Sequence, residues 1–268
     1  MILLAIDVGN SNISIGVYKN KKLICVWRIT TRHNFTSDEL GISIIQFLEH
    51  FSINYKEINE IAISSVVPPL EYPIKEMVRN YFNLNPWWVG NNLPYPITIK
   101  TDNPKEVGAD LVAGAYGALK LYGLPIIIVD FGTATTFSAV SKNGEFLGTA
   151  IAPGIAISAE ALFSRAAKLP RIQIKPPPSP IGTNTINSMQ SGFFYGFVGQ
   201  VEKIIQKFKE ELKSAKVVAT GGLAELIAKE TKVVNFLNSN LVLDGIHLLY
   251  FSATQQQKEP FAKLVNKK

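Results

Sequence analysis

Cysteine and histidine are scarce in this sequence: there is one cysteine, Cys25, and there are three histidines among 268 residues. A single thiol excludes an intramolecular disulfide framework and a cysteine-rich metal site. We therefore expect a reducing compartment and a cytoplasmic protein. Long hydrophobic runs are also missing, because Lys120, Pro125 and three glycines interrupt the most apolar window, residues 111–129. No membrane span is expected, and the acid at Asp7, with no basic segment before it, argues against a signal peptide.

A strong charge of one sign is absent as well. The formal net charge is +6, and residues 254–268 supply half of it through four lysines and one glutamate. We interpret this tail as a solvated chain end, because a nucleic-acid-binding surface would gather its charges on one face with aromatic residues between them. Binding to nucleic acid is therefore not expected. A mild positive charge suits a small polyanionic substrate such as a nucleotide.

The sequence does contain enough hydrophobic residues, 47%, for a substantial core. Residues 2–7 form an apolar run that ends in an acid, and a glycine-containing turn follows. Residues 13–18 and 23–30 are typical of two further strands, so three antiparallel strands are predicted at the N-terminus.

The same order of strand, acid, glycine turn and two strands returns from residue 125 onward, with Asp130 in the position of Asp7. The repeat predicts an α/β protein made of two domains of related design that face each other. The boundary is expected within a helix over residues 107–123, which divides the chain into residues 1–115 and 116–268.

The remaining elements are predicted from apolar spacing and turn residues. Ser37 is the expected N-cap of a helix whose apolar residues repeat from Leu40 to Phe51. Proline excludes regular structure over residues 175–180, which should form an extended connector. Further helices are expected at residues 70–82, 107–122, 154–167, 189–212 and 223–229, and further strands at 61–63, 87–89, 137–140, 146–151 and 217–219.

The first acid-glycine turn, residues 7–12, suits a phosphate group. Gly9 allows the backbone to approach an anion, and amide groups of a tight turn can surround phosphate oxygens. Asp7 at the end of a strand suits a hydrated Mg²⁺, which favours one or two carboxylates together with phosphates. A plain hairpin turn with an Asx cap is the alternative.

Two later segments follow similar logic. Residues 130–136 combine an acid, a glycine and three threonines after a strand, although threonine is also common within strands. Thr220, Gly221 and Gly222 follow an apolar strand and leave bare backbone against which a base or ribose can lie. A tight strand-to-helix turn is the alternative for this third segment.

Asp110 is the candidate proton acceptor. It is expected in the first turn of an alanine-rich helix, where the helix N-terminus favours the ionised form of a carboxyl. A carboxylate there can accept the proton of a substrate hydroxyl during attack on phosphorus. The alternative is an acid that only complements the helix dipole.

The two acid-glycine turns and the later Thr-Gly-Gly, in this order, resemble the actin-like ATPase and sugar-kinase superfamily. More specifically, the chain resembles the type III pantothenate kinases, and the similarity extends from residue 1 to about residue 250. The motifs that carry it are residues 7–12, 64–69, 103–110, 129–136, 152–155, 158–162, 169–170, 188–192, 195–200 and 219–223.

This resemblance implies two actin-like (ribonuclease H-like) domains, with mixed sheets flanked by helices and a cleft between them. It implies transfer of the γ-phosphoryl of ATP to the primary hydroxyl of pantothenate, with Mg²⁺, a monovalent cation (K⁺ or NH₄⁺) and a homodimer. The implied ATP-binding residues are Asp7, Val8, Gly9, Asn10, Ser11, Asn12, Ile13, Ser14, Thr133, Gly221 and Gly222. Asp110 would be catalytic, Asp130 would bind the monovalent cation, and Thr101, Gly108, Ala109, Asp110, Leu111 and Thr185 would contact pantothenate.

Three positions depart from the family pattern, and all belong to the implied pantothenate pocket. Leu111 replaces an arginine, Thr101 stands where many members have tyrosine, and Thr183 stands where lysine is common. Leucine supplies none of the forked donors with which arginine binds a carboxylate. Phosphoryl transfer is therefore better supported than the identity of the acceptor. A non-catalytic nucleotide-binding accessory factor for transcription and a kinase for another small alcohol remain alternatives.

Overall fold

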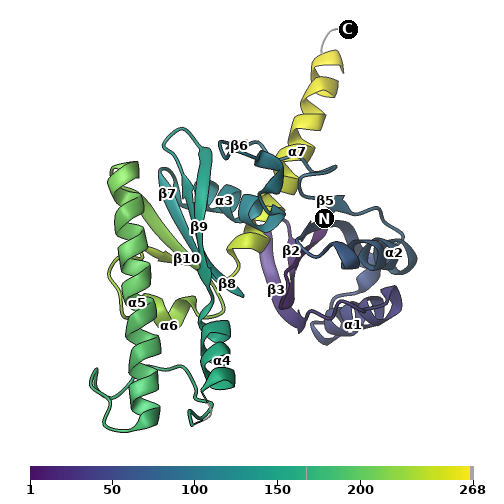
Figure 1. Cartoon of the computed structure of the whole chain (residues 1–268). Helices are drawn as coiled ribbons and strands as arrows, with labels where there is room; N and C mark the ends of the chain where they lie inside the picture. The colour runs from purple at the N-terminus through teal and green to yellow at the C-terminus, as the bar shows by residue number, and fades with distance from the viewer. Residues whose placement is uncertain (167, 266–268) are drawn as a thin grey trace. The chain divides into compact units, whose positions relative to one another are not determined.

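The computed structural model describes residues 1–166 and 168–265, with side chains described up to residue 254. The chain forms two compact units, each with one β-sheet (Figure 1). Unit 1 comprises residues 1–97, 103–117 and the segment from Leu241 onward, and unit 2 comprises residues 98–102 and 118–240. This differs from a division into residues 1–115 and 116–268, because the C-terminal helix α7 (Leu241–Val265) packs on the sheet of unit 1. Within residues 1–166 and 168–265, no helix is both long and apolar enough to cross a membrane.

The sheet of unit 1 has five strands in the order β3-β2-β1-β4-β5. Asn20 and Lys21 connect β2 to β3 with φ values of 49° and 71°, the left-handed conformations of a tight hairpin turn. The three antiparallel strands predicted at the N-terminus are confirmed, and β4 and β5 join them in parallel. The bounds are β1 (Ile2–Val8), β2 (Asn12–Lys19), β3 (Lys22–Thr30), β4 (Ile58–Ser65) and β5 (Trp87–Trp88).

Helices α1 (Ser37–His50) and α2 (Glu71–Phe82) cover one face of this sheet (Figure 1). Alternate residues of β1, from Ile2 to Val8, point toward this face. The prediction that Ser37 caps α1 is wrong by one residue. Thr36 is the N-cap: its Oγ1 accepts a hydrogen bond from Glu39 N at 3.1 Å, and Glu39 Oε2 accepts one from Thr36 N at 3.0 Å. Ser37 cannot form this reciprocal capping box, because the residue three positions later is leucine. Three short 3₁₀ segments complete the connections, η1 (Tyr55–Glu57), η2 (Pro68–Leu70) and η3 (Pro104–Glu106).

Helix α7 covers the opposite face and packs on β1, β2 and β4. Gly16 leaves room for it, since a Cβ at that position would lie 3.3 Å from Leu243 Cδ1. Tyr18 Oη donates to Asp244 Oδ1 at 2.7 Å, and the Tyr18 ring stacks on His247 with 4.3 Å between centroids. Sequence patterns did not predict α7. Part of the tail interpreted as a solvated end continues this helix to Val265, and residues 266–268 lie outside the described part.

Helix α3 (Ala109–Tyr122) crosses α7 at close range. A Cβ on Gly117 would lie 2.9 Å from Leu241 O and 3.1 Å from Gly245 Cα. A Cβ on Gly245 would overlap the carbonyl oxygen of Ala113. Glycine is therefore what lets the two helix backbones approach, and this crossing sets the position of the N-terminal half of α3.

The sheet of unit 2 has six strands in the order β11-β10-β7-β8-β9-β6. The long strands were predicted, whereas β6 and β11 were not, because two residues are too few to display an alternating pattern. The bounds are β6 (Thr98–Ile99), β7 (Ile126–Phe131), β8 (Ala134–Val140), β9 (Glu145–Pro153), β10 (Lys216–Gly221) and β11 (Phe236–Leu237).

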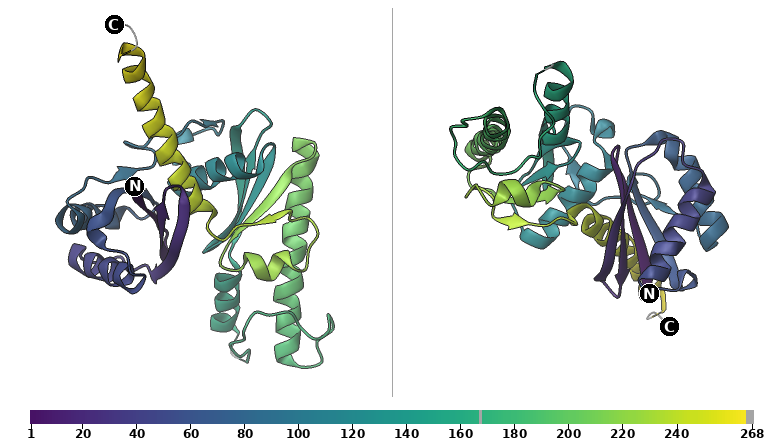
Figure 2. Two further views of the ribbon diagram at one scale, coloured as in Figure 1. Left: turned by 180° about the vertical axis from the view of Figure 1, so that it is seen from behind. Right: turned by 90° about the horizontal axis from the view of Figure 1, so that it is seen from below.

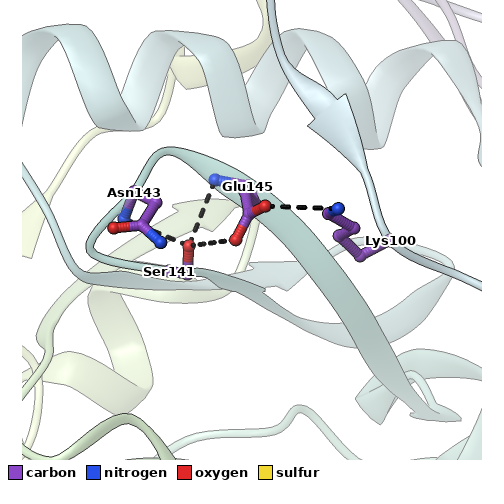
Figure 3. A network of polar contacts seen from close by, with 4 residues as sticks. All are labelled: Lys100, Ser141, Asn143 and Glu145. Carbon is purple, nitrogen blue, oxygen red and sulfur yellow. Dashed lines mark hydrogen bonds and ion pairs between the residues drawn. The ribbon is translucent and has the colours of Figure 1, made fainter.

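Polar contacts at the turn between β8 and β9 hold β6 to this sheet (Figure 3). Ser141 Oγ accepts hydrogen bonds from Asn143 N at 3.2 Å and Glu145 N at 3.3 Å. The Glu145 carboxylate pairs with Lys100 Nζ at 3.4 Å. Lys100 directly follows β6, so this ion pair restrains the segment that contains Thr101.

Helices α5 (Thr185–Leu212) and α6 (Ala224–Ala228) cover one face of the second sheet. Helix α4 (Ile155–Arg165) lies beside α5, as both views of Figure 2 show. The corresponding predicted helices are confirmed, although α5 begins at Thr185, where Asn184 Oδ1 accepts from Asn187 N at 2.9 Å. Residues 175–180 have no regular secondary structure, as predicted, and residue 167 lies outside the described part.

Candidate functional site

The turn after β1 is a compact loop held by hydrogen bonds. Gly9 N donates to Asn12 O at 3.0 Å, and Thr31 N donates to Ser11 O at 3.0 Å. The Thr31 hydroxyl donates to Gly9 O at 2.6 Å. Asn10 and Ser11 stay exposed at the tip of the loop. The loop therefore presents polar groups to solvent on a backbone that hydrogen bonds hold in place.

Asp7 lies in the middle of a polar row across three strands. It pairs with Ser14 of β2 on one side and with Ser64 of β4 on the other. Paired residues of neighbouring strands point to the same face, and this face is the one that α7 covers, opposite the face toward which Ile6 and Val8 point. Asp7 and Ser14 are half-buried and Ser64 is fully buried. The row brings one carboxylate between two hydroxyl groups at the carboxyl end of β1.

Asp110 lies in the first turn of α3, as predicted. Its Oδ1 accepts a hydrogen bond from Leu111 N at 2.7 Å. Gly108 connects this turn to the sheet, because a Cβ there would lie 3.4 Å from Val66 Cγ1, and Val66 N donates to Val8 O at 3.1 Å. The candidate proton acceptor and the first acid-glycine turn therefore belong to the same region of unit 1.

Burial dominates the electrostatics of Asp110. Desolvation raises the pKa of its carboxyl above the ordinary aspartate value, and the hydrogen bonds from backbone N–H groups of Leu111 and Asp110 oppose this rise only in part. The sequence-based expectation stressed the helix N-terminus, which favours the ionised form. In the structure the cost of removing the carboxylate from water is larger than the stabilisation that these hydrogen bonds give to the ionised form. A raised pKa brings the group closer to neutral pH, where a general base is most effective.

Unit 2 repeats the polar row. Asp130 of β7 pairs with Thr136 of the antiparallel strand β8 and with Thr220 of the parallel strand β10. The three residues share the face opposite the one that α5 and α6 cover. The aspartate that begins each acid-glycine turn thus has a hydroxyl residue on both neighbouring strands, which the sequence repeat alone did not reveal.

The second acid-glycine turn and the Thr-Gly-Gly segment are adjacent in unit 2. Gly221 has φ of +91°, and a Cβ there would lie 2.5 Å from Asp130 Oδ1. Gly132 N donates to Ala134 O at 3.1 Å, and Gly154 N donates to Thr133 O at 3.2 Å. The start of α4, the turn after β7 and the glycines after β10 therefore form one cluster of closely packed backbone, into which no Cβ fits at Gly221 or Gly154.

The predicted pantothenate residues are divided between the units. Gly108, Ala109, Asp110 and Leu111 belong to unit 1, whereas Thr101 and Thr185 belong to unit 2. The buried Thr101 Oγ1 has no hydrogen-bond partner within the described residues.

Thr185 opens α5 and contributes to a pocket of about 690 Å³ in unit 2. Thr183, Leu162 and Phe193 also line this pocket.

Sequence reasoning missed four residues of these rows or turns: Thr31, Ser64, Thr136 and Thr220 had no assigned role. Thr220 was noted only as the first residue of its motif. The sequence feature that could have indicated a role for Ser64 was its position as a polar residue directly after an apolar strand. Its partner across the sheet depends on a parallel pairing between residues far apart in the chain.

Within the described ranges, no group of three or more histidine, cysteine, aspartate or glutamate residues is arranged to hold a metal ion.

Several solved structures share this fold over nearly the whole chain. A Campylobacter jejuni protein described as a Baf family transcriptional activator is 20% identical, with a TM-score of 0.61 over 94% of this chain and 99% of that chain. The Acidaminococcus fermentans (R)-2-hydroxyglutaryl-CoA dehydratase component A is 15% identical, with a TM-score of 0.54 over 93% and 97%. The Clostridium difficile activator of 2-hydroxyisocaproyl-CoA dehydratase, solved with ADPNP, is 12% identical, with a TM-score of 0.51 over 97% and 98%.

These likenesses establish the fold, an actin-like ATPase and sugar-kinase fold with two mixed sheets flanked by helices. A family model described as type III pantothenate kinase matches residues 3–207, which is most of the chain.

Proposed function

Because the chain belongs to the type III pantothenate kinase family, we propose that it phosphorylates the primary hydroxyl of pantothenate with ATP. The product would be 4′-phosphopantothenate, the first intermediate on the route to coenzyme A. The observation that carries the proposal is the arrangement in unit 1, where the half-buried Asp110 lies in the same region as the turn that follows Asp7. A kinase needs both a phosphate-binding loop and a proton acceptor for the attacking hydroxyl.

Catalysis would rest on positioning and on charge neutralisation, since phosphoryl transfer needs little covalent help from the protein. The loop from Asp7 to Ser14 would hold the ATP phosphates, and Thr133, Gly221 and Gly222 would contact the nucleotide from unit 2. Asp110 would accept the hydroxyl proton as the oxygen attacks phosphorus. Its raised pKa supports this role, because a carboxyl of ordinary pKa is a weak base near neutral pH.

Two cations belong to the proposal. A strand-end carboxylate flanked by hydroxyl groups fits the oxygen ligands that Mg²⁺ prefers, so Asp7 would hold Mg²⁺ together with ATP oxygens. Asp130, also flanked by two hydroxyl residues, would help to bind K⁺ or NH₄⁺. When bound, these ions neutralise phosphate charge.

The three positions at which this chain departs from the family pattern, Thr101, Leu111 and Thr183, belong to the proposed acceptor pocket. Gly108, Ala109 and Leu111 beside the catalytic acid, together with Thr101 and Thr185, would contact pantothenate. Leu111 removes the guanidinium expected for the pantothenate carboxylate. We therefore expect weaker binding of pantothenate than an arginine at this position would give.

A homodimer is proposed as the working state. Unit 2 exposes several large apolar side chains, and a Cβ on Gly192, Gly196 or Gly199 of α5 would meet no atom within 4 Å. The open space beside these glycines leaves room for a helix of a second copy, and exposed apolar side chains suit contact with it. The exposed fractions are 69% for Ile151, 45% for Ile157, 39% for Leu162, 81% for Ile181 and 50% for Ile186.

A nucleotide-binding regulator is the second candidate. The loss of the family arginine at Leu111 favours it, and one structural neighbour is described as a Baf family transcriptional activator. The presence of Asp110 argues for catalysis. A kinase for another small alcohol, such as a sugar or pantetheine, is the third candidate.

The deciding experiment offers γ-labelled ATP with Mg²⁺ to the full chain, together with pantothenate, pantetheine and several sugars, in K⁺ and in Na⁺ buffers. We expect label transfer to pantothenate that depends on K⁺ and disappears in the Asp110→Asn variant, whose folding is checked by circular dichroism. Transfer to another alcohol alone would refute pantothenate as acceptor. Tight ATP binding with no transfer to any acceptor would favour the regulator.

A further inference from the structure

Ser64 has an unusual environment in the first sheet. Its side chain is 0% exposed, and its hydroxyl has no hydrogen-bond partner within residues 1–166 and 168–265. It lies opposite Asp7 in the parallel pairing of β1 and β4, on the same face of the sheet. The Ser64 hydroxyl is buried next to a carboxylate, but it forms no hydrogen bond with that carboxylate or with any other described group. It is therefore available for a new contact.

A partnerless hydroxyl in this position has a cost. A buried polar group without a hydrogen bond destabilises the folded state, whereas an alanine of nearly the same size would not. Ala5 and Ala62 form the pair two residues earlier on the same two strands, so they point to the same face as Asp7 and Ser64. Both are buried, which shows that this face accepts alanine. Packing alone therefore does not account for serine at position 64.

The second unit contains the equivalent residue. Ser64 relates to Asp7 as Thr220 relates to Asp130: in each case the hydroxyl residue lies on the parallel strand, directly opposite the acid. Thr220 opens the Thr-Gly-Gly segment that packs against Asp130. The two units thus use one arrangement, in which a hydroxyl group on the parallel neighbour flanks the aspartate.

We propose that Ser64 is a positioning residue whose hydroxyl donates a hydrogen bond to the Asp7 carboxylate and orients it toward the Mg²⁺–nucleotide complex. The inference rests on the proposed nucleotide-dependent function. Serine can reach a different acceptor by rotating about χ1 into another staggered conformer. A bond to a carboxylate is charge-assisted and therefore strong. Because Ser64 is fully buried, it acts through Asp7 and does not touch the ligand itself.

The test is the Ser64→Ala variant of the full chain, with binding of ADPNP measured by calorimetry in the presence of Mg²⁺ and again in EDTA. We expect affinity for Mg²⁺–ADPNP to fall roughly 10- to 100-fold, the usual effect of removing a residue that orients a metal ligand. Metal-free ADPNP binding should change little. The melting temperature should stay equal or rise, because the substitution removes an unsatisfied buried hydroxyl.

Ser65→Ala is the matched control. Ser65 is the next residue of β4, points to the other face, and its Oγ accepts a hydrogen bond from Val67 N at 3.2 Å. This variant should lower the melting temperature and leave Mg²⁺–ADPNP affinity unchanged. The two neighbouring serines are therefore expected to show opposite patterns in stability and in binding.

Each outcome decides between distinct ideas. Unchanged Mg²⁺–ADPNP affinity in Ser64→Ala, or an equal loss in EDTA, would overturn the role of Ser64 and leave the kinase proposal intact. Failure of the unmodified protein to bind Mg²⁺–ADPNP would overturn both. A Mg²⁺-dependent loss in a protein that does not phosphorylate pantothenate would support Ser64 and refute only the acceptor.

Discussion

The close crossing of α3 and α7 permits a sharp prediction, because it fixes the helix that carries Asp110. We consider Gly117→Ala. The new methyl group would lie 2.9 Å from Leu241 O and 3.1 Å from Gly245 Cα, and neither atom belongs to a flexible side chain. The helix backbones must therefore separate, and the start of α3 must move with them.

The magnitude follows from two opposing effects. Alanine gains about 1 kcal/mol over glycine in a helix interior. Overpacking of a tight contact costs about 1–3 kcal/mol. Gly114→Ala in the same buried helix isolates the first effect, because its Cβ would make only an ordinary contact, 3.7 Å from Val242 Cγ2. The free energies of unfolding of the two variants should therefore differ by about 1–3 kcal/mol, with Gly117→Ala the less stable.

Urea unfolding monitored by circular dichroism measures this difference, and phosphotransfer to pantothenate gives a second readout. A displacement of Asp110 by about 1 Å would lower turnover by about 100-fold, since proton transfer depends on close approach. Gly114→Ala should be as stable as the unmodified protein or more stable. Equal stability of Gly117→Ala and Gly114→Ala would refute the close crossing on which the reasoning depends.

The remaining predictions concern a buried histidine and the glycine beside the second aspartate. Burial lowers the pKa of His247 from 6.5 to about 4. As pH falls, the unfolded chain therefore binds the proton before the folded protein does. The free energy of unfolding decreases by at most about 3 kcal/mol between about pH 6.5 and about pH 4. His247→Phe keeps the stacking on Tyr18 and should flatten this part of a melting-temperature profile against pH; an unchanged slope would contradict the assignment. Gly221→Ala should lower the melting temperature, because φ is +91° and the Cβ would crowd Asp130, whereas Gly222→Ala, with open space around its Cβ, should be tolerated. Equal melting temperatures for these two variants would show that Gly221 is not needed there.

Strands and turns that depend on neighbouring residues could be predicted from the sequence. The apolar runs that end in Asp7 and Asp130 predict strands followed by glycine turns, because strand formation and turn preference depend on neighbouring residues. The start of α1 shows the limit of such reasoning: Thr36 and Ser37 are both good N-caps, and only the partner three residues later, Glu39, decides between them.

The sequence by itself thus determined most strands and helices, the repeated acid-glycine turns and the candidate proton acceptor, since these depend on residues a few positions apart. Only the tertiary structure decided that α7 joins unit 1 and that Ser64 faces Asp7. Parallel pairing joins residues that are far apart in the chain, and its register follows from the packing of whole elements. A shift of one residue would turn Ser64 to the other face of the sheet.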